Sequence, residues 1–417
     1  MEMWREKGLA IADSNTVTRN KLGWKVPSQS GNGTYIVSID GGEPYCTCQH
    51  FETTHDKCQH IYAIEFIIQK EQHPDGTTVV TETRRITYSQ NWSLYDDVQT
   101  HEEERFVILL RDLCNGIPQP EQTFGRPRLP LSDMVFGITY KTYSTMSGRR
   151  FMPSIRDAAT KALVTKCPSF ASNARYLENP EITPLLKSLI EQSARPLKSI
   201  ETDFAVDSSG FTTTTYDRWF DHKWGKERSQ GKWIKAHLMC GVKTHIVTSV
   251  EVTPTDSADA PRLPQLVEAT AKHFTINDVC ADKAYSSKKN LHSIQMVNGT
   301  PYIPFKSYCK GSQGDRHFDG LWDRMWHYFS FNQEAFMQHY HKRSNVETTF
   351  SMIKMKFGAM VRAKTPVAQV NEVLCKILCH NICVLIQSMS ELKLEPIFQT
   401  FDTEKAVVPK ALVNWGF

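Results

Sequence analysis

The spacing of apolar and polar residues predicts that the second half of the chain begins with strands and continues with alternating helices and strands. Apolar and polar side chains alternate over residues 200–207, which is typical of a strand with one buried face. Runs at 233–242 and 245–253 predict the next two strands. The later elements are predicted to be a helix at 260–273, a strand at 276–281, a helix at 287–297, a strand at 300–305, a helix around Glu347 and a last helix at 369–390.

The order of these elements is that of the ribonuclease-H-like fold, so we predict an α/β domain built on a mixed sheet. In such a sheet, an acid on the first strand lies beside an acid at the carboxyl end of the fourth strand, and a helix can bring a third. Asp207, Asp282 and Glu347 occupy these positions, and Asp203 is a rival to Asp207 on the same strand face. Three carboxylates at one point repel each other unless cations lie among them. Two Mg²⁺ (or Mn²⁺) ions ~4 Å apart would neutralise them and catalyse displacement at phosphorus.

The most informative motif reads Tyr340-x2-Arg343-x3-Glu347-x6-Lys354. At about 100° per residue, these side chains fall within roughly 60° of one helix face. A carboxylate among cations is unfavourable in a hydrophobic core, because each charge would have to be desolvated and paired. Facing DNA, the carboxylate can hold a metal while the cations bind phosphates. The alternative is a simple helical salt bridge between Glu347 and Arg343.

Residues 200–390 resemble the DDE transposases of prokaryotic insertion sequences. The motifs that carry this resemblance are 205–211, 281–287, 302–306 and, above all, the Tyr-Arg-Glu-Lys signature. The resemblance implies that Asp207, Asp282 and Glu347 bind catalytic Mg²⁺ or Mn²⁺. It also implies that Tyr340, Arg343 and Lys354 contact transposon-end DNA. One departure is Ala284, where relatives often have glycine.

A second motif, Cys46-x-Cys48-x9-Cys58-x-His60, offers three thiolates and one imidazole. This set matches the tetrahedral preference of Zn²⁺, and four protein ligands make a closed, structural site. The pattern resembles the SWIM zinc finger, with a strand at 34–40 before the ligands and an apolar helix at 59–70 that includes the last one. His50 and His55 lie inside the loop and remain rival ligands.

The composition fits a globular protein inside the cell. Hydrophobic residues make up 40% and charged residues 23% of the 417-residue chain. The sequence contains no run of 18 or more apolar residues, so we expect no transmembrane helix. The first residues lack an apolar signal segment, and the odd number of cysteines, 11, suits a reducing compartment. We therefore expect a cytoplasmic protein without membrane contact. Cys375, Cys379 and Cys383 recur among apolar residues and are interpreted as part of a core helix.

The net charge of +4 is mild, but basic residues cluster at 218–235, among aromatic side chains, and at 342–364. Such runs suit a nucleic-acid surface or a solvated protein face. Predicted helices at 133–146 and 154–166 fit either a helix-turn-helix reader or plain packing helices. The predicted domains are a SWIM-type zinc finger at 1–75, a connecting segment at 76–130, a helical region that is a candidate for DNA binding at 131–197, a ribonuclease-H-like catalytic domain at 198–390 and a tail at 391–417.

Together these features predict a DNA transposase that hydrolyses a phosphodiester at each element end and then joins the 3′-hydroxyl to target DNA. Its partners would be double-stranded DNA and, in synapsis, a second copy of the chain. Two alternatives stay open: a DNA-binding regulator that has lost its chemistry, and a ribonuclease-H-like nuclease that cuts but cannot join.

Overall fold

The computed structural model describes most of the chain, and every structural statement below concerns the described residues. These are residues 4, 7–8, 11–12, 17–20, 23–28, 33–39, 44–72, 78–82, 92–125, 127–213, 233–307, 309, 320–394, 396 and 398. They form two compact units, Met1–Asn91 and Trp92–Phe417. Most of the predicted basic and aromatic run at 218–235 lies outside the described residues, as does most of the tail.

The first unit contains a four-stranded antiparallel sheet with two short helices. The strands follow one another in the order β1 (Thr18–Asn20), β2 (Gly23–Pro27), β3 (Thr34–Ser38) and β4 (Tyr45–Cys46). Helices α2 (Gln49–Thr54) and α3 (Gln59–Ile67) come next, and β5 (Ile68–Gln72) pairs with β6 (Thr78–Glu82). The core includes Trp24, Val26, Val37, Ile61 and Ile64. This small core buries few large side chains, so a bound metal would contribute much of its stability.

The second unit is built around a five-stranded mixed sheet. Its strands are β7 (Asp203–Thr212), β8 (Trp233–Gly241), β9 (Val247–Pro254), β10 (Asp278–Ala281) and β11 (Thr300–Tyr302). The sheet order is β11-β10-β7-β8-β9, with β7, β8 and β9 antiparallel and β10 and β11 parallel to β7. The predicted ribonuclease-H-like mixed sheet is therefore confirmed.

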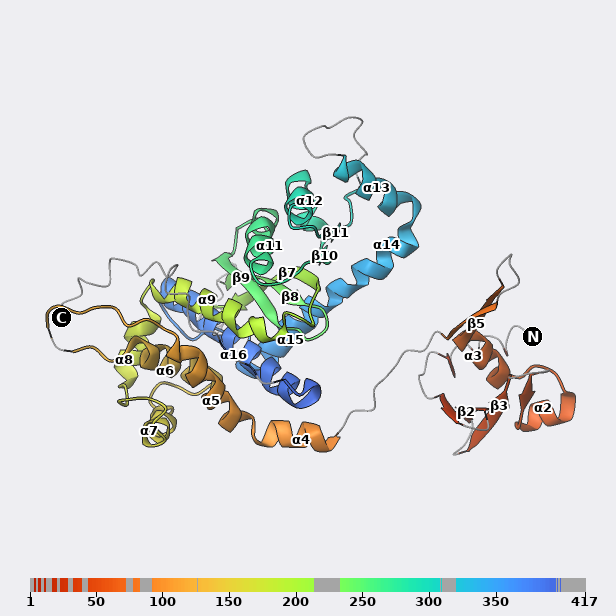
Figure 1. Ribbon diagram of the computed structural model, residues 1–417, viewed down its shortest axis with the longest axis horizontal. Helices are drawn as coiled ribbons and strands as arrows, with labels where there is room; N and C mark the ends of the chain where they lie inside the picture. Colours follow the sequence, from red (N-terminus) through yellow and green to blue (C-terminus); the bar gives the residue numbers. More distant parts are fainter. Residues whose placement is uncertain are drawn as a thin grey trace, which may run out of the picture. The chain divides into compact units, whose positions relative to one another are not determined.

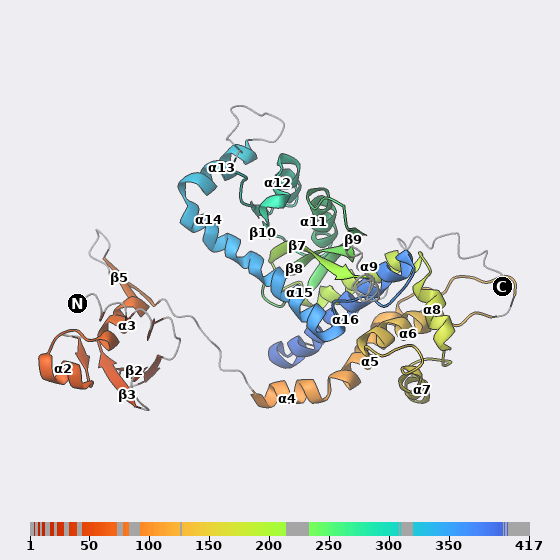
Figure 2. The same cartoon turned by 180° about the vertical axis from the view of Figure 1, so that it is seen from behind.

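Helices cover both faces of this sheet (Figures 1 and 2). One face carries α11 (Leu263–Ala271) and α12 (Lys288–Gln295), and the short 3₁₀ helices η2 (Ala260–Arg262) and η3 (Lys283–Tyr285) precede them along the chain. The other face carries α9 (Ile182–Ala194), α15 (Ser344–Phe357) and α16 (Pro366–Leu392), and the 3₁₀ helix η1 (Arg195–Leu197) follows α9. The connection from β11 to α15 passes through α13 (Leu321–Phe331), α14 (Gln333–Tyr340) and η5 (His341–Arg343).

Helix α16 is the central core helix of this unit. It is long and apolar enough to cross a membrane by length and composition, but 78% of its most apolar window is buried inside the protein. Cys375 and Cys379 are fully buried, and the Cys379 thiol donates to the Thr139 carbonyl at 3.4 Å. These cysteines act as small apolar side chains, as the sequence predicted.

Five further helices of this unit precede the sheet. They are α4 (Trp92–Thr100), α5 (Glu102–Asn115), α6 (Leu131–Tyr143), α7 (Met152–Thr160) and α8 (Phe170–Leu177). Four of them, α4, α5, α6 and α8, pack onto α16. Helix α6 is buried along most of its length and contacts α5, α8 and α16. A helix so enclosed by protein cannot enter a DNA groove, so the packing interpretation describes α6 better than the helix-turn-helix interpretation.

Candidate active site and zinc centre

The register of two neighbouring strands places the first two predicted acids side by side. Strand β10 runs parallel to β7 with Ala281 opposite Val206, so the next residues, Asp282 and Asp207, face each other. Adjacent strands lie ~4.8 Å apart, which brings these two carboxylates to one point at the sheet. Strand β10 ends just before Asp282, whereas β7 continues to Thr212. The prediction that Asp207 lies at the end of its strand was wrong, because β8 pairs with β7 well beyond that position.

The third acid reaches the same point from α15, which packs on β7 and β8. Arg343 donates one hydrogen bond to Asp207 at 2.7 Å and another to Glu347. The guanidinium therefore lies between two of the three carboxylates. The Asp207 side chain is 21% exposed and that of Glu347 57%. Glu347 is accordingly the acid with most freedom to adjust to a bound ion.

The electrostatics of Asp207 show that this point favours a cation. Burial raises the pKa of Asp207 above its usual value, and the neighbouring carboxylates of Asp282 and Glu347 raise it further. The Ser208 N–H, which donates at 2.8 Å, and the Arg343 guanidinium both oppose this rise in the pKa. The rise persists despite Arg343, so the site has capacity for more positive charge.

The sequence predicted that the Tyr-Arg-Glu-Lys stripe lies on one uninterrupted α-helix. In the structure the stripe extends over α14, the 3₁₀ turn η5 and α15. Tyr340 ends α14, Arg343 ends the 3₁₀ turn η5, and Glu347 and Lys354 belong to α15. The dihedral angles remain right-handed helical through Tyr340 and Arg343, so the path of the chain is continuous. The Arg343 guanidinium lies 5.9 Å from the centre of the Tyr340 ring.

Lys354 points toward the far part of β7. Its ammonium donates to the Ser209 hydroxyl at 2.6 Å and lies 5.3 Å from the Phe211 ring centre. Burial lowers the pKa of Lys354. Ser209 follows Asp207 by two residues, so Lys354 is held on the same face of β7 as Asp207.

A second ion-pair network anchors the helical connection to the amino-terminal ends of the parallel strands. Lys342 donates to Asp203 at 2.7 Å and to Asp278 at 2.8 Å, and His339 lies 2.8 Å from Asp278. The rival ligand Asp203 is therefore ion-paired, ~13 Å along β7 from Asp207. The sequence gives no sign of this network beyond the place of Lys342 in a basic run.

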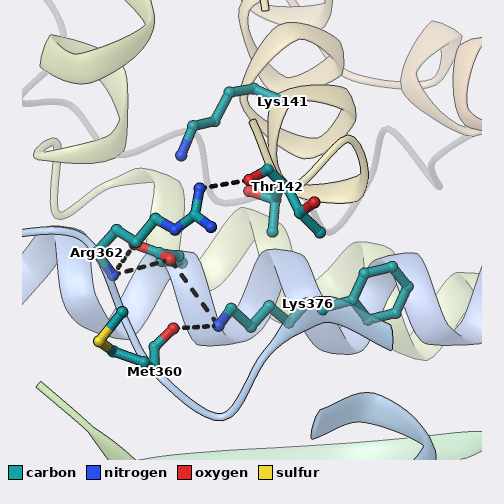
Figure 3. A pocket seen from close by; sticks show the side chains of 8 residues that line it. Lys141, Thr142, Met360, Arg362 and Lys376 are labelled. Carbon is teal, nitrogen blue, oxygen red and sulfur yellow. Dashed lines mark hydrogen bonds and ion pairs between the residues drawn. The ribbon is translucent and has the colours of Figure 1, made fainter. Parts of the chain in front are cut away.

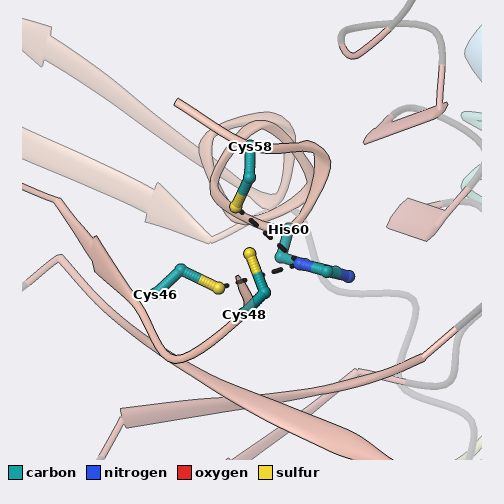
Figure 4. Close-up of side chains that lie close together, drawn as sticks. All are labelled: Cys46, Cys48, Cys58 and His60. Carbon is teal, nitrogen blue, oxygen red and sulfur yellow. Dashed lines mark hydrogen bonds between the residues drawn. The ribbon is translucent and has the colours of Figure 1, made fainter. Parts of the chain in front are cut away.

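The four predicted zinc ligands converge in the first unit (Figure 4). The sulfur atoms of Cys46, Cys48 and Cys58 and the His60 imidazole nitrogen are all buried, and lie within 4.8 Å of one another. The Nδ1 atom of His60 lies 3.7 Å from the sulfurs of both Cys46 and Cys58. Tetrahedral Zn²⁺ with bonds of ~2.1–2.3 Å holds its ligand atoms at about this separation. The site therefore fits zinc in both composition and geometry.

The rival histidines lie outside this cluster. The His50 ring packs 4.5 Å from the Trp4 ring and its Nδ1 lies 3.1 Å from the Thr54 hydroxyl. His55 ends α2 in a left-handed conformation, with its ring against Phe51. Neither histidine belongs to the cluster of metal-ligating side chains formed by the described residues.

Two known protein families match the chain, one at the three acids and one at the zinc centre. Residues 198–382 match the model of the transposase DDE domain. Residues 35–68 match the model of the SWIM zinc finger. The two matches support a DDE transposase with a SWIM zinc finger. A DDE domain implies binding to DNA and to a divalent metal ion, and the SWIM match supports structural zinc.

Proposed function

We propose that this protein is a transposase that hydrolyses phosphodiester bonds at the ends of an insertion sequence and then transfers the freed strands to target DNA. In this proposal Asp207, Asp282 and Glu347 hold two Mg²⁺ or Mn²⁺ ions. The observation that carries it is the convergence of these acids, through the β7–β10 register and the hydrogen bonds of Arg343. When bound, the metal ions activate a water or a 3′-hydroxyl and stabilise the leaving oxygen.

The other side chains of the stripe take supporting roles in this proposal. Arg343 holds Asp207 and Glu347 together in the free protein and supplies a fixed cation beside the reacting phosphate. Lys354, fixed on Ser209, binds a DNA phosphate, and Tyr340 packs against Arg343 and the DNA. We propose from these side chains that the protein belongs to the Tyr-Arg-Glu-Lys subgroup of DDE transposases. Two copies would act together on paired element ends.

The zinc centre has a structural role in this proposal. Cys46 ends β4, Cys48 precedes α2, and Cys58 and His60 lie at the start of α3. One Zn²⁺ ion would therefore tie a strand to two helices, and it would leave no open position for catalysis. The first unit then serves as a stable attachment module for DNA or a protein partner.

A cleavage and joining assay tests the proposed function. The substrate is a duplex that contains the ends of the element, with Mg²⁺ and a plasmid target. Asp207→Asn, Asp282→Asn and Glu347→Gln should each abolish cleavage while DNA binding is largely retained. Asp157→Asn is a control with the same change of charge at an exposed position on α7. A wild-type protein that binds these ends but neither cuts nor joins them would favour the regulator.

A precut substrate separates the transposase from the nuclease. Supplying an end with a free 3′-hydroxyl bypasses the hydrolytic step, so a transposase should join it to the plasmid. A protein that cuts intact ends but leaves the precut end unjoined would be a nuclease.

A further inference from the structure

A small pocket lies between the end of α6 and the two helices α15 and α16 (Figure 3). It has a volume of about 20 Å³ and opens to solvent. Its walls come from the end of α6, the end of α15, the α15–α16 connection and α16. The lining residues are Lys141, Thr142, Thr145, Phe357, Met360, Arg362, Glu372 and Lys376. Three of them are cations and one is an anion.

The single carboxylate of the pocket is already occupied by backbone donors. Glu372 accepts hydrogen bonds from the Arg362 N–H at 3.1 Å and from the Ala363 N–H at 2.8 Å. The Lys376 ammonium is 3.9 Å from Glu372 and donates to the carbonyls of Gly358 and Met360 at 2.8 and 2.7 Å. Glu372 therefore neutralises at most one of the three cations.

The cation at the base of the pocket is almost fully enclosed. Lys376 is 2% exposed, so its charge is costly to keep in the folded protein. Burial lowers the pKa of Lys376 to about 8; Glu372 opposes this fall, and the nearby charges of Arg362 and Lys141 add to it. An anion in the pocket would offset this repulsion.

The two outer cations have free donors that point into the same space. One terminal nitrogen of the Arg362 guanidinium donates a hydrogen bond to the Thr145 carbonyl. Among the described residues, the Lys141 ammonium has no hydrogen-bond or ion-pair partner, and Figure 3 shows its tip next to the Arg362 guanidinium. Two like charges beside each other, in a pocket whose one carboxylate already accepts from backbone donors, form a ready site for a tetrahedral oxyanion.

We propose that this pocket binds a backbone phosphate of the DNA on which the protein acts, with Lys141 and Arg362 as its two donors. The inference rests on the proposed function, because it assigns a second contact to the same DNA. Phe357 lies ten residues along α15 from Glu347, or ~15 Å at 1.5 Å per residue. At that distance the bound phosphate lies a few nucleotides from the reacting one. The pocket would thus set the register of the DNA over the acids.

The test measures binding of the full-length protein to a 40-base-pair duplex by fluorescence anisotropy over a series of KCl concentrations. The variants are Lys141→Gln, Arg362→Gln and the double variant. Lys272→Gln removes one charge from the end of α11, on the opposite face of the sheet, and serves as the matched control. Loss of one phosphate contact lowers the slope of log K against log[KCl] by about 0.9.

We expect the double variant to lose about one unit of slope and roughly tenfold in affinity at 0.15 M KCl. The slope of the double variant should decrease by about one unit rather than two, because both donors face one phosphate. Cleavage position should also become less uniform in both single variants. The Lys272→Gln control should keep the wild-type slope.

Three results are distinguishable from the expected one. If wild type binds and cuts DNA while the double variant keeps its slope, the pocket is not a DNA site and the inference fails alone. The inference also fails alone if ³¹P NMR shows that Lys141 and Arg362 bind inorganic phosphate while neither substitution changes the affinity for DNA. If wild type does not bind DNA at all, the proposed function fails, and this inference fails with it.

Discussion

Replacing Lys342 with methionine should destabilise the catalytic unit and loosen the helix that carries Glu347. Lys342 is the shared partner of Asp203 and Asp278, at 2.7 and 2.8 Å. Its neighbour Arg343 holds Asp207, four residues further along the same strand. The two consecutive cations therefore fasten η5 along β7. Methionine keeps most of the packing of the lysine stem but leaves two carboxylates facing each other without the ammonium.

The size of the effect follows from the burial of the three groups. Removing one partner from a fully buried ion pair costs about 3–5 kcal/mol, and an exposed pair costs about 0–1 kcal/mol. The Lys342 side chain is 29% exposed, and those of Asp203 and Asp278 are 21% and 14% exposed. The network lies between the two limits, so we expect a loss of about 2 kcal/mol, or roughly 3–5 °C in Tm.

The pH dependence of this loss has a definite sign. The two carboxylates raise the pKa of Lys342 against the opposing effect of burial. A lysine whose pKa is raised on folding contributes its full stabilisation below the unfolded pKa of about 10.4, and loses it as the pH rises through the folded value. The difference between wild type and Lys342→Met should therefore stay constant from pH 7 to pH 9.

Thermal unfolding followed by circular dichroism measures this difference. Lys161→Met is a matched control, since Lys161 forms an exposed pair with Asp157 and should leave Tm unchanged. Titration with Mn²⁺ gives a second readout, because a loosened η5 should weaken metal binding at the acids. Equal Tm values for wild type and Lys342→Met, with unchanged Mn²⁺ affinity, would show that this network does not position α15.

Further predictions concern the acids, the zinc centre, a buried histidine and the stripe. Asp203→Asn should retain catalytic metal binding in calorimetric titration, whereas Asp207→Asn should lose it; the reverse pattern would make Asp203 the ligand. Cys58→Ser should lose one zinc per chain by elemental analysis and render the first unit sensitive to limited proteolysis, while Cys167→Ser keeps the metal. Burial lowers the pKa of His380 to about 4 from a usual value near 6.5, so its stabilising contribution is complete above pH 6.5 and is lost as the pH falls toward 4. Wild type should thus lose about 2 kcal/mol through His380 by pH 5, and His380→Gln should remove that part of the pH dependence in denaturant titrations. Lys354→Ala should weaken DNA binding and lower the salt slope by about one unit in anisotropy titrations, and an unchanged slope would place Lys354 away from the phosphates.

Local patterns were sufficient to predict the order of the elements. Strand alternation around Asp207 and the apolar run before Asp282 are set by neighbouring residues, so they were visible in the sequence. The zinc ligands were visible for the same reason, because all four lie within fifteen residues. What local patterns could not give was the continuation of β7 past Asp207, which depends on pairing with the distant strand β8.

The remaining differences also come from contacts between distant parts of the chain. The stripe divides at η5, where Lys342 reaches the start of two strands. The sequence of α16 predicted an apolar core helix, and it gave no sign that Lys376 would be buried against two carbonyls of the preceding connection. Charged residues satisfied by distant partners leave no periodic signal, so such networks become visible only in the folded structure.

The most direct test of the central claim is anomalous diffraction from crystals of the protein grown or soaked with Mn²⁺ and DNA. We expect two manganese peaks ~4 Å apart, bound by oxygen atoms of Asp207, Asp282 and Glu347. Manganese bound at Asp203 and Asp278 instead, or no manganese at the three acids in a complex that cleaves DNA, would contradict it.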